Sequence, residues 1–387
     1  MELRKSYEGA ASLEIRQGSY GFRVLRDVLT CGEMRYATLR LYARDGVAVK
    51  NVQKAVARLI DKGVLKIVGV GKTKALRYVY NAENNRLVVA LYGDGILDRL
   101  MSATNDLHYT TSSRTYQDKQ QRRWRMGEVC AMLDSLGCPL WRDGAPPGGL
   151  TAYSSTEIRQ SCGDVNLAAN SRLAAELVSE AAAYAVYGIG PTLQRWNKEA
   201  ERRGKRAIEL AAMQRGERHQ VSDAICFYAK ESIPAEYIRG YGRIKGTVKH
   251  RCIGIHNSAD VYRSFHLIPL NIHGKAMLKL LCIPNLKDVL CDMFTLTPTA
   301  HGQMPLVCHG YNGNSAVFFA ITGDLNGLYR FLTGYSMGLS KTVVCWDWQK
   351  DMIEKFLAEQ GLDVTIWDYE SQNLIQEIQR RTSLWKK

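Results

Sequence analysis

The last third of the chain alternates short apolar runs with helical patterns, and this alternation restricts the available folds more than any other feature. Residues 305–312 and 315–323 are two apolar runs that meet around Gly313 and Asn314, as expected for a β-hairpin. A helix, a strand, a second helix and a second strand are predicted after them, at residues 325–339, 342–348, 350–360 and 363–369. Strands that alternate with helices build a sheet covered by helices, so an α/β domain is predicted here.

Positive charge is concentrated in the first third of the chain. The 387 residues carry a formal net charge of +14, and residues 1–127 hold 23 Lys and Arg against 12 Asp and Glu. A concentrated basic field attracts polyanions through phosphate contacts and the release of counterions. Nucleic acid is therefore the first partner we expect and an anionic membrane surface the second. A solvated basic surface without a partner is the remaining alternative.

Neither a membrane segment nor a secretory signal is indicated. No run of about 18 apolar residues occurs, and the opening MELRKSYEG lacks an apolar stretch behind its charges. The ten cysteines include no C-x-x-C pair, so neither a zinc ribbon nor a disulfide framework is expected. Reduced, buried cysteines fit a cytoplasmic protein, and we expect no cofactor and no metal.

The segment VKNVQKAVARLIDKG, residues 49–63, predicts a helix with one apolar and one basic face. With about 100° per residue, Val52, Val56, Leu59 and Ile60 gather on the apolar side. Lysine contacts phosphate, whereas asparagine and arginine also read base edges in the major groove. The opposite side presents the predicted DNA-binding residues Lys50, Asn51, Lys54 and Arg58.

The neighbouring segments complete the pattern of a winged helix-turn-helix domain. Residues 18–30 and 33–43 predict two helices before the basic one, and residues 64–70 and 75–80 predict the strands of a basic hairpin after it. In such a domain the third helix enters the major groove and the hairpin contacts flanking phosphate. A three-helix domain that binds protein is the competing interpretation. The further predicted phosphate contacts are Arg35, Arg40, Lys72, Lys74 and Arg77.

The predicted organisation has three parts. These are a winged helix-turn-helix domain at 1–101, a basic polar linker at 102–126, and an α/β domain at 127–387 that could divide into 127–300 and 301–387. In the linker, Trp124 could extend the nucleic-acid surface by stacking on a base, or it could pack on a helix predicted at 127–137.

The terminal strands and helices also suggest a comparison with restriction-endonuclease-like nucleases. Such enzymes hold Mg²⁺ with an Asp on one strand and an acid-x-Lys triplet on the next. Here His309 stands where an acid is expected, and no such triplet follows. A divergent metal-dependent nuclease would have to use Asp324 or Asp347, so catalysis is the alternative and not the expected function. A zinc site among His301, Cys308 and His309 lacks a further ligand at suitable spacing.

Three segments together resemble a known family: VKNVQKAVARLIDKGVLKI, SRLAAELVSEAAAYAVYGIG and SAVFFAITGDLNGLYRFLTGY. The chain is similar to the replication-relaxation-type proteins of Gram-positive conjugative elements and plasmids. Those proteins join an amino-terminal winged helix to an α/β domain that resembles a degenerate restriction-endonuclease-like core. The missing acidic constellation in this sequence puts nuclease chemistry in doubt.

The resemblance implies a DNA-binding accessory or regulatory protein of a bacterial mobile element, acting in replication, mobilisation or transcription control. It implies double-stranded DNA as the partner. A homodimer and contacts with relaxosome or replication proteins are further candidates, and a protein-interaction module is the second alternative.

Overall fold

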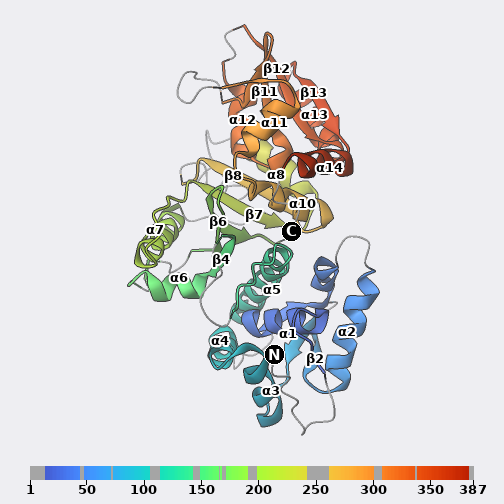
Figure 1. Cartoon of the computed structure of the whole chain (residues 1–387), viewed down its shortest axis with the longest axis vertical. Helices are drawn as coiled ribbons and strands as arrows, with labels where there is room; N and C mark the ends of the chain where they lie inside the picture. The colour runs from blue at the N-terminus through green and yellow to red at the C-terminus, as the bar shows by residue number, and fades with distance from the viewer. Residues whose placement is uncertain are drawn as a thin grey trace. The chain divides into compact units, whose positions relative to one another are not determined.

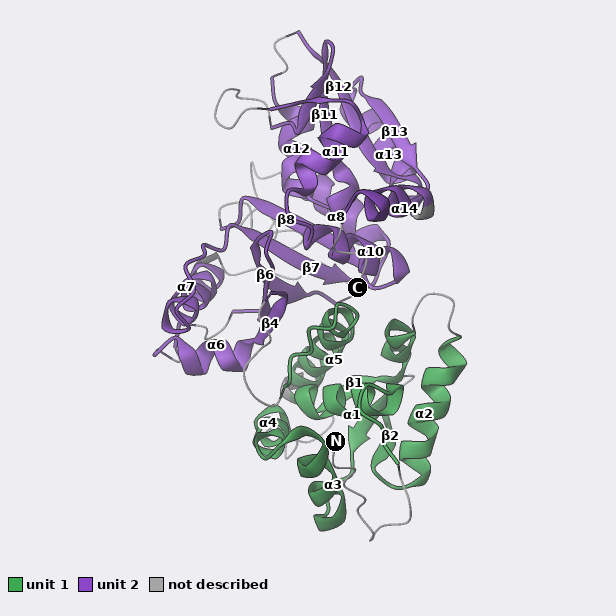
Figure 2. Ribbon diagram, in the orientation of Figure 1, with its two compact units in different colours: residues 1–147 green, residues 148–387 purple. Residues whose placement is uncertain are grey.

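The computed structural model describes residues 14–43, 48–70, 73–104, 114–142, 149–164, 166–167, 171–190, 198–241, 261–299, 307–335 and 338–382. It is a mixed α/β structure (Figure 1). The chain divides into two compact units, residues 1–147 and residues 148–387, which Figure 2 distinguishes by colour. The division therefore falls after residue 147, and not at the linker predicted at 102–126.

Unit 1 contains a three-stranded antiparallel sheet with the strand order β1-β3-β2. The strands and the hairpin fit the prediction for residues 64–80, and α1 and α2 fit the predicted first and third helices. Its elements are α1 (Tyr20–Cys31), β1 (Glu33–Arg35), the 3₁₀ helix η1 (Tyr36–Tyr42), α2 (Val49–Asp61), β2 (Leu65–Val70), β3 (Thr73–Tyr78), α3 (Ala82–Tyr92), α4 (Gly95–Thr104) and α5 (Arg114–Asp134).

Helix α2 ends where its backbone turns into the left-handed region. Gly63 has φ +69°, a conformation that glycine adopts without steric cost. Its amide donates to the carbonyl of Ile60 at 2.9 Å, and the next amide, of Val64, donates to the carbonyl of Leu59 at 2.9 Å. This pair of bonds satisfies the last carbonyls of the helix and sends the chain directly into β2.

The prediction of one helix over residues 33–43 is wrong. Residues Glu33–Arg35 form β1, which pairs with β3, and residues Tyr36–Tyr42 form η1. The side chains of Glu33 and Met34 are fully buried. Tertiary contacts to β3 therefore decide the conformation of this segment against its local preference for a helix.

The prediction of a linker at 102–126 is also wrong for the residues that the structure describes. Residues 102–104 end α4, and residues 114–126 belong to α5, a helix of 21 residues that contacts α1, β1 and η1. Tyr116, Gln120 and Trp124 are at most 4 % exposed. Because they recur every four residues, they form one face of the helix, and this face anchors α5 in unit 1.

Unit 2 contains two five-stranded sheets, which are built from consecutive parts of the chain. Its first part comprises β4 (Thr151–Ser154), α6 (Ser155–Ser161), β5 (Leu173–Val178), β6 (Ala183–Gly188), α7 (Lys198–Gln214), β7 (Asp223–Tyr228), α8 (Ser232–Tyr241), β8 (Ser264–Pro269) and α10 (Ile272–Leu281). Its second part comprises α11 (Leu286–Met293), β9 (Thr297–Pro298), β10 (Gly310–Asn312), β11 (Ser315–Phe319), the 3₁₀ helix η2 (Ala320–Thr322), α12 (Leu325–Thr333), β12 (Ser340–Trp346), the 3₁₀ helix η3 (Asp347–Gln349), α13 (Lys350–Gln360), β13 (Thr365–Tyr369) and α14 (Ser371–Arg381).

The two sheets share one topology. In each of them three strands pair antiparallel in chain order, and two further strands then add in parallel after a helix each. The β4–β8 sheet uses α7 and α8 as these connections, and the β9–β13 sheet uses α12 and α13. The predicted hairpin around Gly313 and the elements predicted after it are present, but the strand predicted at 315–323 ends at Phe319 and the helix predicted at 325–339 ends at Thr333. Strands β4, β5 and β7 were not predicted.

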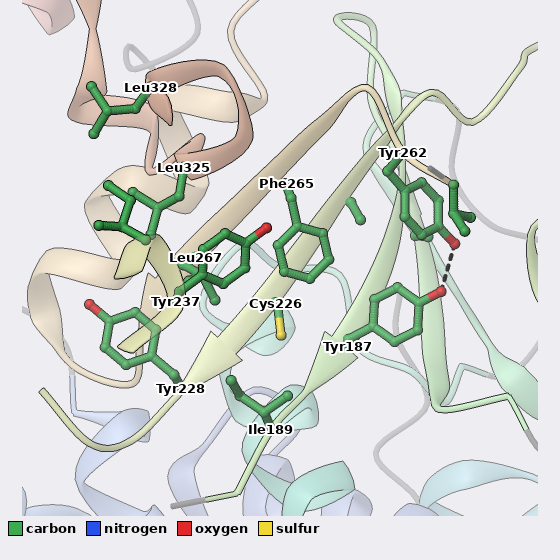
Figure 3. Close-up of a cluster of buried hydrophobic side chains, with 14 of the residues drawn as sticks. Tyr187, Ile189, Cys226, Tyr228, Tyr237, Tyr262, Phe265, Leu267, Leu325 and Leu328 are labelled. Atoms are coloured by element: carbon green, nitrogen blue, oxygen red, sulfur yellow. Dashed lines mark hydrogen bonds between the residues drawn. The ribbon is translucent and has the colours of Figure 1, made fainter. Parts of the chain in front are cut away.

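A hydrophobic core with aromatic members continues from one sheet to the other (Figure 3). Leu325 and Leu328 of α12 belong to the same buried cluster as Leu267 of β8. The segment between η2 and α12 also binds the outer edge of β8, because the amide of Leu267 donates to the carbonyl of Gly323 at 2.9 Å. The amide of Phe265 donates to Oδ1 of Asp324 at 2.9 Å. The two sheets of unit 2 are thus held together by hydrogen bonds from the main-chain amides of β8 as well as by packing.

Candidate nucleic-acid interface

The outward face of α2 carries the predicted DNA-binding residues. Val52, Val56 and Leu59 are at most 1 % exposed, which fixes the rotation of the helix about its axis. Four side chains on the opposite face are exposed: Lys50, Asn51, Lys54 and Arg58. The three cations are spaced four residues apart and so form one row along the helix, about 12 Å long at 1.5 Å per residue.

The charge of this row is not neutralised by the described residues. In the part of the chain that the structure describes, neither lysine of the row nor Arg58 has an ion pair with a carboxylate. The face is therefore a basic strip on a packed helix, and an anion can approach all three cations from solvent.

The hairpin that follows α2 carries further exposed cations. Lys74 is exposed on β3, and Lys66 is exposed on β2. Lys62, which caps α2, is exposed too. Lys62 and Lys66 were not among the predicted residues. The alternation of Leu65, Lys66 and Ile67 gives no sound signal for Lys66, because Ile67 is exposed too, at 45 %. The predicted residue Lys72 lies outside the described residues.

Two predicted phosphate contacts turn out to be engaged inside unit 1. Arg35 forms an ion pair with Glu128 of α5. Arg77 forms an ion pair with Glu33, and it donates to the hydroxyl of Tyr116 at 3.0 Å. A DNA phosphate would therefore compete with an internal carboxylate for each of these guanidinium groups. Arg40 is exposed on η1.

Glu33 is the centre of the network that holds Arg77. Its carboxylate is fully buried, and it accepts hydrogen bonds from Nε2 of Gln120 at 2.7 Å and from Nε1 of Trp124 at 2.8 Å. Against the lowering effect of burial, the hydrogen bond to Glu33 raises the pKa of Arg77. Since Trp124 is buried and bonded here, the alternative in which it stacks on a base is wrong.

A second buried network joins α5 to α1 and η1. Asp134 accepts from Nε of Arg23 at 2.7 Å and from a terminal nitrogen of Arg26 at 2.6 Å. Arg26 also donates to Asp27 at 2.8 Å, and the hydroxyl of Tyr42 donates to Asp27 at 2.7 Å. Together the two networks connect α1, η1 and the sheet to α5, so α2 lies on a scaffold with many internal bonds.

The acidic residues of the nuclease alternative have structural roles. Oδ1 of Asp324 accepts from the backbone amides of Phe265 and, at 3.1 Å, Gly327, so this carboxylate caps α12. Asp347 is exposed and accepts from the amide of Trp348 at 2.8 Å. Lys350 forms its ion pair with Asp368 at 3.0 Å. No pair of acids converges at these positions among the described residues.

The predicted His and Cys group does not assemble a zinc site in the described part of the chain. Nδ1 of His309 accepts a hydrogen bond from the amide of Phe319 at 2.9 Å. Burial lowers the pKa of His309 to about 3, so the imidazole is neutral at physiological pH. Cys308 precedes His309 in the chain, and neither belongs to a group of three potential metal ligands among the described residues. His301 lies outside the described residues.

One other cluster in unit 2 brings titratable side chains together. Glu176 on β5 is fully buried, and its two oxygens lie 2.8 Å from a terminal nitrogen of Arg215 and 2.6 Å from Nε2 of His219. Arg215 also donates to Glu217 at 2.7 Å and lies 3.6 Å from the ring centre of Tyr153. Glu176, Glu217 and His219 are close enough to bind a metal ion, but the guanidinium of Arg215 already supplies the positive charge between the carboxylates.

This cluster makes the stability of unit 2 depend on pH. The hydrogen bond to Glu176 raises the pKa of His219 above its ordinary value of 6.5. Protonated His219 therefore stabilises the fold fully below about pH 6.5, and this contribution is lost as the pH rises through the raised pKa. Although burial opposes it, hydrogen bonding to Arg215 lowers the pKa of Glu217, so Glu217 remains charged over the same interval.

We expect His219→Gln to lower the melting temperature of unit 2 by about 2–4 °C near pH 6 and by less near pH 9. Thermal unfolding of the full chain at a series of pH values measures the difference. Gln220→Ala, an exposed neighbour that does not titrate, is the control. An equal loss for His219→Gln at all pH values would contradict the assignment of the charged pair.

No helix among the described residues is long and apolar enough to cross a membrane. No family model, no curated protein and no solved structure matches the chain.

Proposed function

We propose that unit 1 is a winged helix-turn-helix domain that binds double-stranded DNA with α2 in the major groove. The observation that carries this proposal is the row of exposed cations on α2, opposite its buried valines. The surrounding order of elements supports it: a helix, a short strand, a 3₁₀ helix, α2, and then a two-stranded hairpin in a sheet of order β1-β3-β2. A helix that packs by one face and is followed by a hairpin can enter a groove while the hairpin contacts the flanking backbone.

The residues of this face have distinct roles in the proposal. Lys50, Lys54 and Arg58 hold phosphates, which sets the position of the helix on the duplex without reading its sequence. Asn51, next to this row in the first turn of α2, is the residue whose amide suits the edge of an adenine. The cations Lys66 and Lys74 of the hairpin add backbone contacts. Arg35 and Arg77 are left out because internal carboxylates hold them.

Unit 2 has a different role in this proposal. Asp324 caps α12, Asp347 accepts a hydrogen bond from the amide of the next residue, Trp348, and no observation favours nuclease chemistry. We therefore assign unit 2 to self-association or to contacts with replication or relaxosome proteins. The whole chain is then a cytoplasmic accessory or regulatory protein of a bacterial mobile element, as its resemblance to the replication-relaxation-type proteins suggests.

The test is the salt dependence of DNA binding by the variant Lys50→Ala/Lys54→Ala/Arg58→Ala. Each phosphate contact contributes about 0.9 to the slope of log K against log salt concentration. We expect the triple variant to lose up to about 3 from the magnitude of this slope and to bind duplex DNA at least about tenfold more weakly. Fluorescence anisotropy with a labelled duplex measures both quantities.

A charge-matched control separates this effect from the loss of net charge. Arg16, Arg86 and Arg122 are exposed cations of unit 1 that lie outside α2 and the hairpin. The variant Arg16→Ala/Arg86→Ala/Arg122→Ala should keep most of the slope. If both triple variants bind like the wild type, α2 does not contact DNA. Selection of bound fragments from the DNA of the element would then show whether any site is enriched at all.

A further inference from the structure

A basic hollow lies beside α7 in unit 2, whereas the residues assigned to DNA binding belong to unit 1. Its volume is about 580 Å³, and four cations of α7 line it together with Glu209 and Met213. Arg202, Arg203 and Arg206 are exposed, and Lys205 is half-buried. The sequence alone suggests only a helix with charges of both signs, because Glu199, Glu201 and Glu209 alternate with these cations.

The structure separates these charges by fixing the rotation of α7. Glu201 is 1 % exposed, and its carboxylate accepts from Oγ of Ser171 at 2.8 Å and from the amide of Arg172 at 3.0 Å. At Gly204 a Cβ atom would lie 2.6 Å from Oγ of Ser171, so the helix approaches the start of β5 closely. The apolar face of α7 is fully buried through Ala200, Ala207, Ile208, Ala211 and Ala212. The cations consequently remain on the outward side.

Little of this outward charge is neutralised. Arg202 pairs with Glu199 at 3.1 Å, but both side chains are largely exposed, and such pairs contribute little. Among the described residues, Arg203 and Arg206 have no ion pair. Nζ of Lys205 lies 3.5 Å from the carbonyl oxygen of Val261. This contact is with a neutral group, and no carboxylate among the described residues pairs with Lys205. The hollow thus has four cations and one lining carboxylate, Glu209.

We propose that this hollow binds successive phosphates of a nucleic-acid strand, as a second contact surface that is independent of α2. From residue 202 to residue 206 a helix rises about 6 Å, which matches about two nucleotides of one strand at 3.4 Å each. The described residues that line the hollow include no aromatic side chain, so the proposed contact is with phosphate and carries no base stacking. The surface therefore contributes affinity without sequence preference.

An anionic membrane fits the same surface less well. A helix that lies on a lipid surface inserts a continuous apolar face, whereas the apolar face of α7 is buried in the protein. Met213 is the exposed apolar side chain among those lining the hollow, at 69 %. A single methionine beside four cations offers little area for insertion.

The test uses the full chain with the variant Arg202→Ala/Arg203→Ala/Arg206→Ala. We expect the magnitude of the salt slope to fall by about 2–3 for a random duplex of about 40 base pairs. A single strand of the same length distinguishes the source of the phosphates. The charge-matched control, Arg159→Ala/Arg218→Ala/Lys355→Ala, removes three exposed cations elsewhere in unit 2 and should keep the slope. Near-ultraviolet circular dichroism checks that each variant is folded.

Each outcome decides the matter. A reduced slope for the α7 variant alone, or in addition to the loss from the α2 variant, supports the inference. If the α2 variant binds normally and the α7 variant does not, the inference holds while the proposed function fails. If the α7 variant has the slope of its control on both probes, or if the wild type binds neither probe, the inference is overturned. It is also overturned if these arginines are needed only for binding to phosphatidylserine vesicles.

Discussion

Replacing Glu33 with alanine is expected to destabilise unit 1 by about 3–5 kcal/mol, because removal of one partner from a buried ion pair leaves the other without compensation. The carboxylate of Glu33 is fully buried and serves three side chains from two elements. Without it the guanidinium of Arg77 loses its ion pair, and the donors of Gln120 and Trp124 lose their acceptor. A buried donor without an acceptor costs about 1–3 kcal/mol.

The isosteric variant Glu33→Gln is the matched comparison. Its amide keeps the size of the side chain and one acceptor oxygen but removes the charge that pairs with Arg77. We expect a loss of about half that of the alanine variant, since part of the hydrogen bonding remains. Urea unfolding, followed by hydrogen exchange of the peptides of unit 1, measures both values, because the seven tryptophans of the chain do not report on unit 1 alone. A loss below about 1 kcal/mol for Glu33→Ala would show that the network does not hold α5 to the sheet.

The second large effect is expected at Gly323, between η2 and α12. Its φ of +73° is in the left-handed region, where a side chain costs about 1–2 kcal/mol. In addition, a Cβ atom there would lie 2.5 Å from the carbonyl oxygen of Leu267, which is a backbone atom of β8 and cannot move aside alone. Overpacking of this kind adds about 1–3 kcal/mol. We therefore expect Gly323→Ala to destabilise unit 2 by about 3 kcal/mol or more.

Gly313 provides a control for the backbone conformation alone. It has φ +55° in the turn between β10 and β11, and a Cβ atom there would meet nothing within 4 Å. Gly313→Ala should cost only about 1–2 kcal/mol. Hydrogen exchange of the peptides that contain β8 and α12 compares the two variants locally. Equal protection in both would mean that the close approach to Leu267 carries no energy.

Local patterns in the sequence predicted the elements that bury their own apolar side chains. The valines of α2 are buried at helical spacing, and the run that became β12 is buried continuously from Thr342 to Trp346, as expected for a strand covered on both faces. The capping box of α6 likewise depends only on residues close together in the chain. Ser154 accepts from the amide of Glu157 at 3.3 Å, and the carboxylate of Glu157 accepts from the amide of Ser154 at 2.7 Å.

The elements that were predicted wrongly depend on partners far along the chain. β1 exists because it pairs with β3 and because Glu33 bonds to Trp124, 91 residues away. The charged residues Arg122, Arg123 and Arg125 favoured the prediction of a linker where the structure has α5. The helical spacing of Tyr116, Gln120 and Trp124, which are buried, is the signal that this prediction overlooked. Local patterns contain no information about such long-range contacts.

The predictions for the candidate site also divide into those that depend on local pattern and those that depend on long-range contacts. The wheel of α2 identified its four outward residues, since only the helix itself determines which face they share. Arg35 and Arg77 resemble the other cations in sequence, but Glu128 and Glu33 engage them in the fold. The rotation of α7, and with it the hollow, depends on the contact of Glu201 with Ser171, 30 residues away. Charge patterning alone could not reveal it.

The way in which β8 is closed has a consequence for association between molecules. A free strand edge can add a strand from another chain and start aggregation, but here the segment around Gly323 and Asp324 takes up the outward amides of Leu267 and Phe265. In the second sheet, the edge strand β9 is two residues long and includes Pro298. It is therefore a poor template for a further strand. Separation of the two sheets of unit 2 would expose the unpaired edge of β8. We therefore expect the two sheets to unfold together in one cooperative transition.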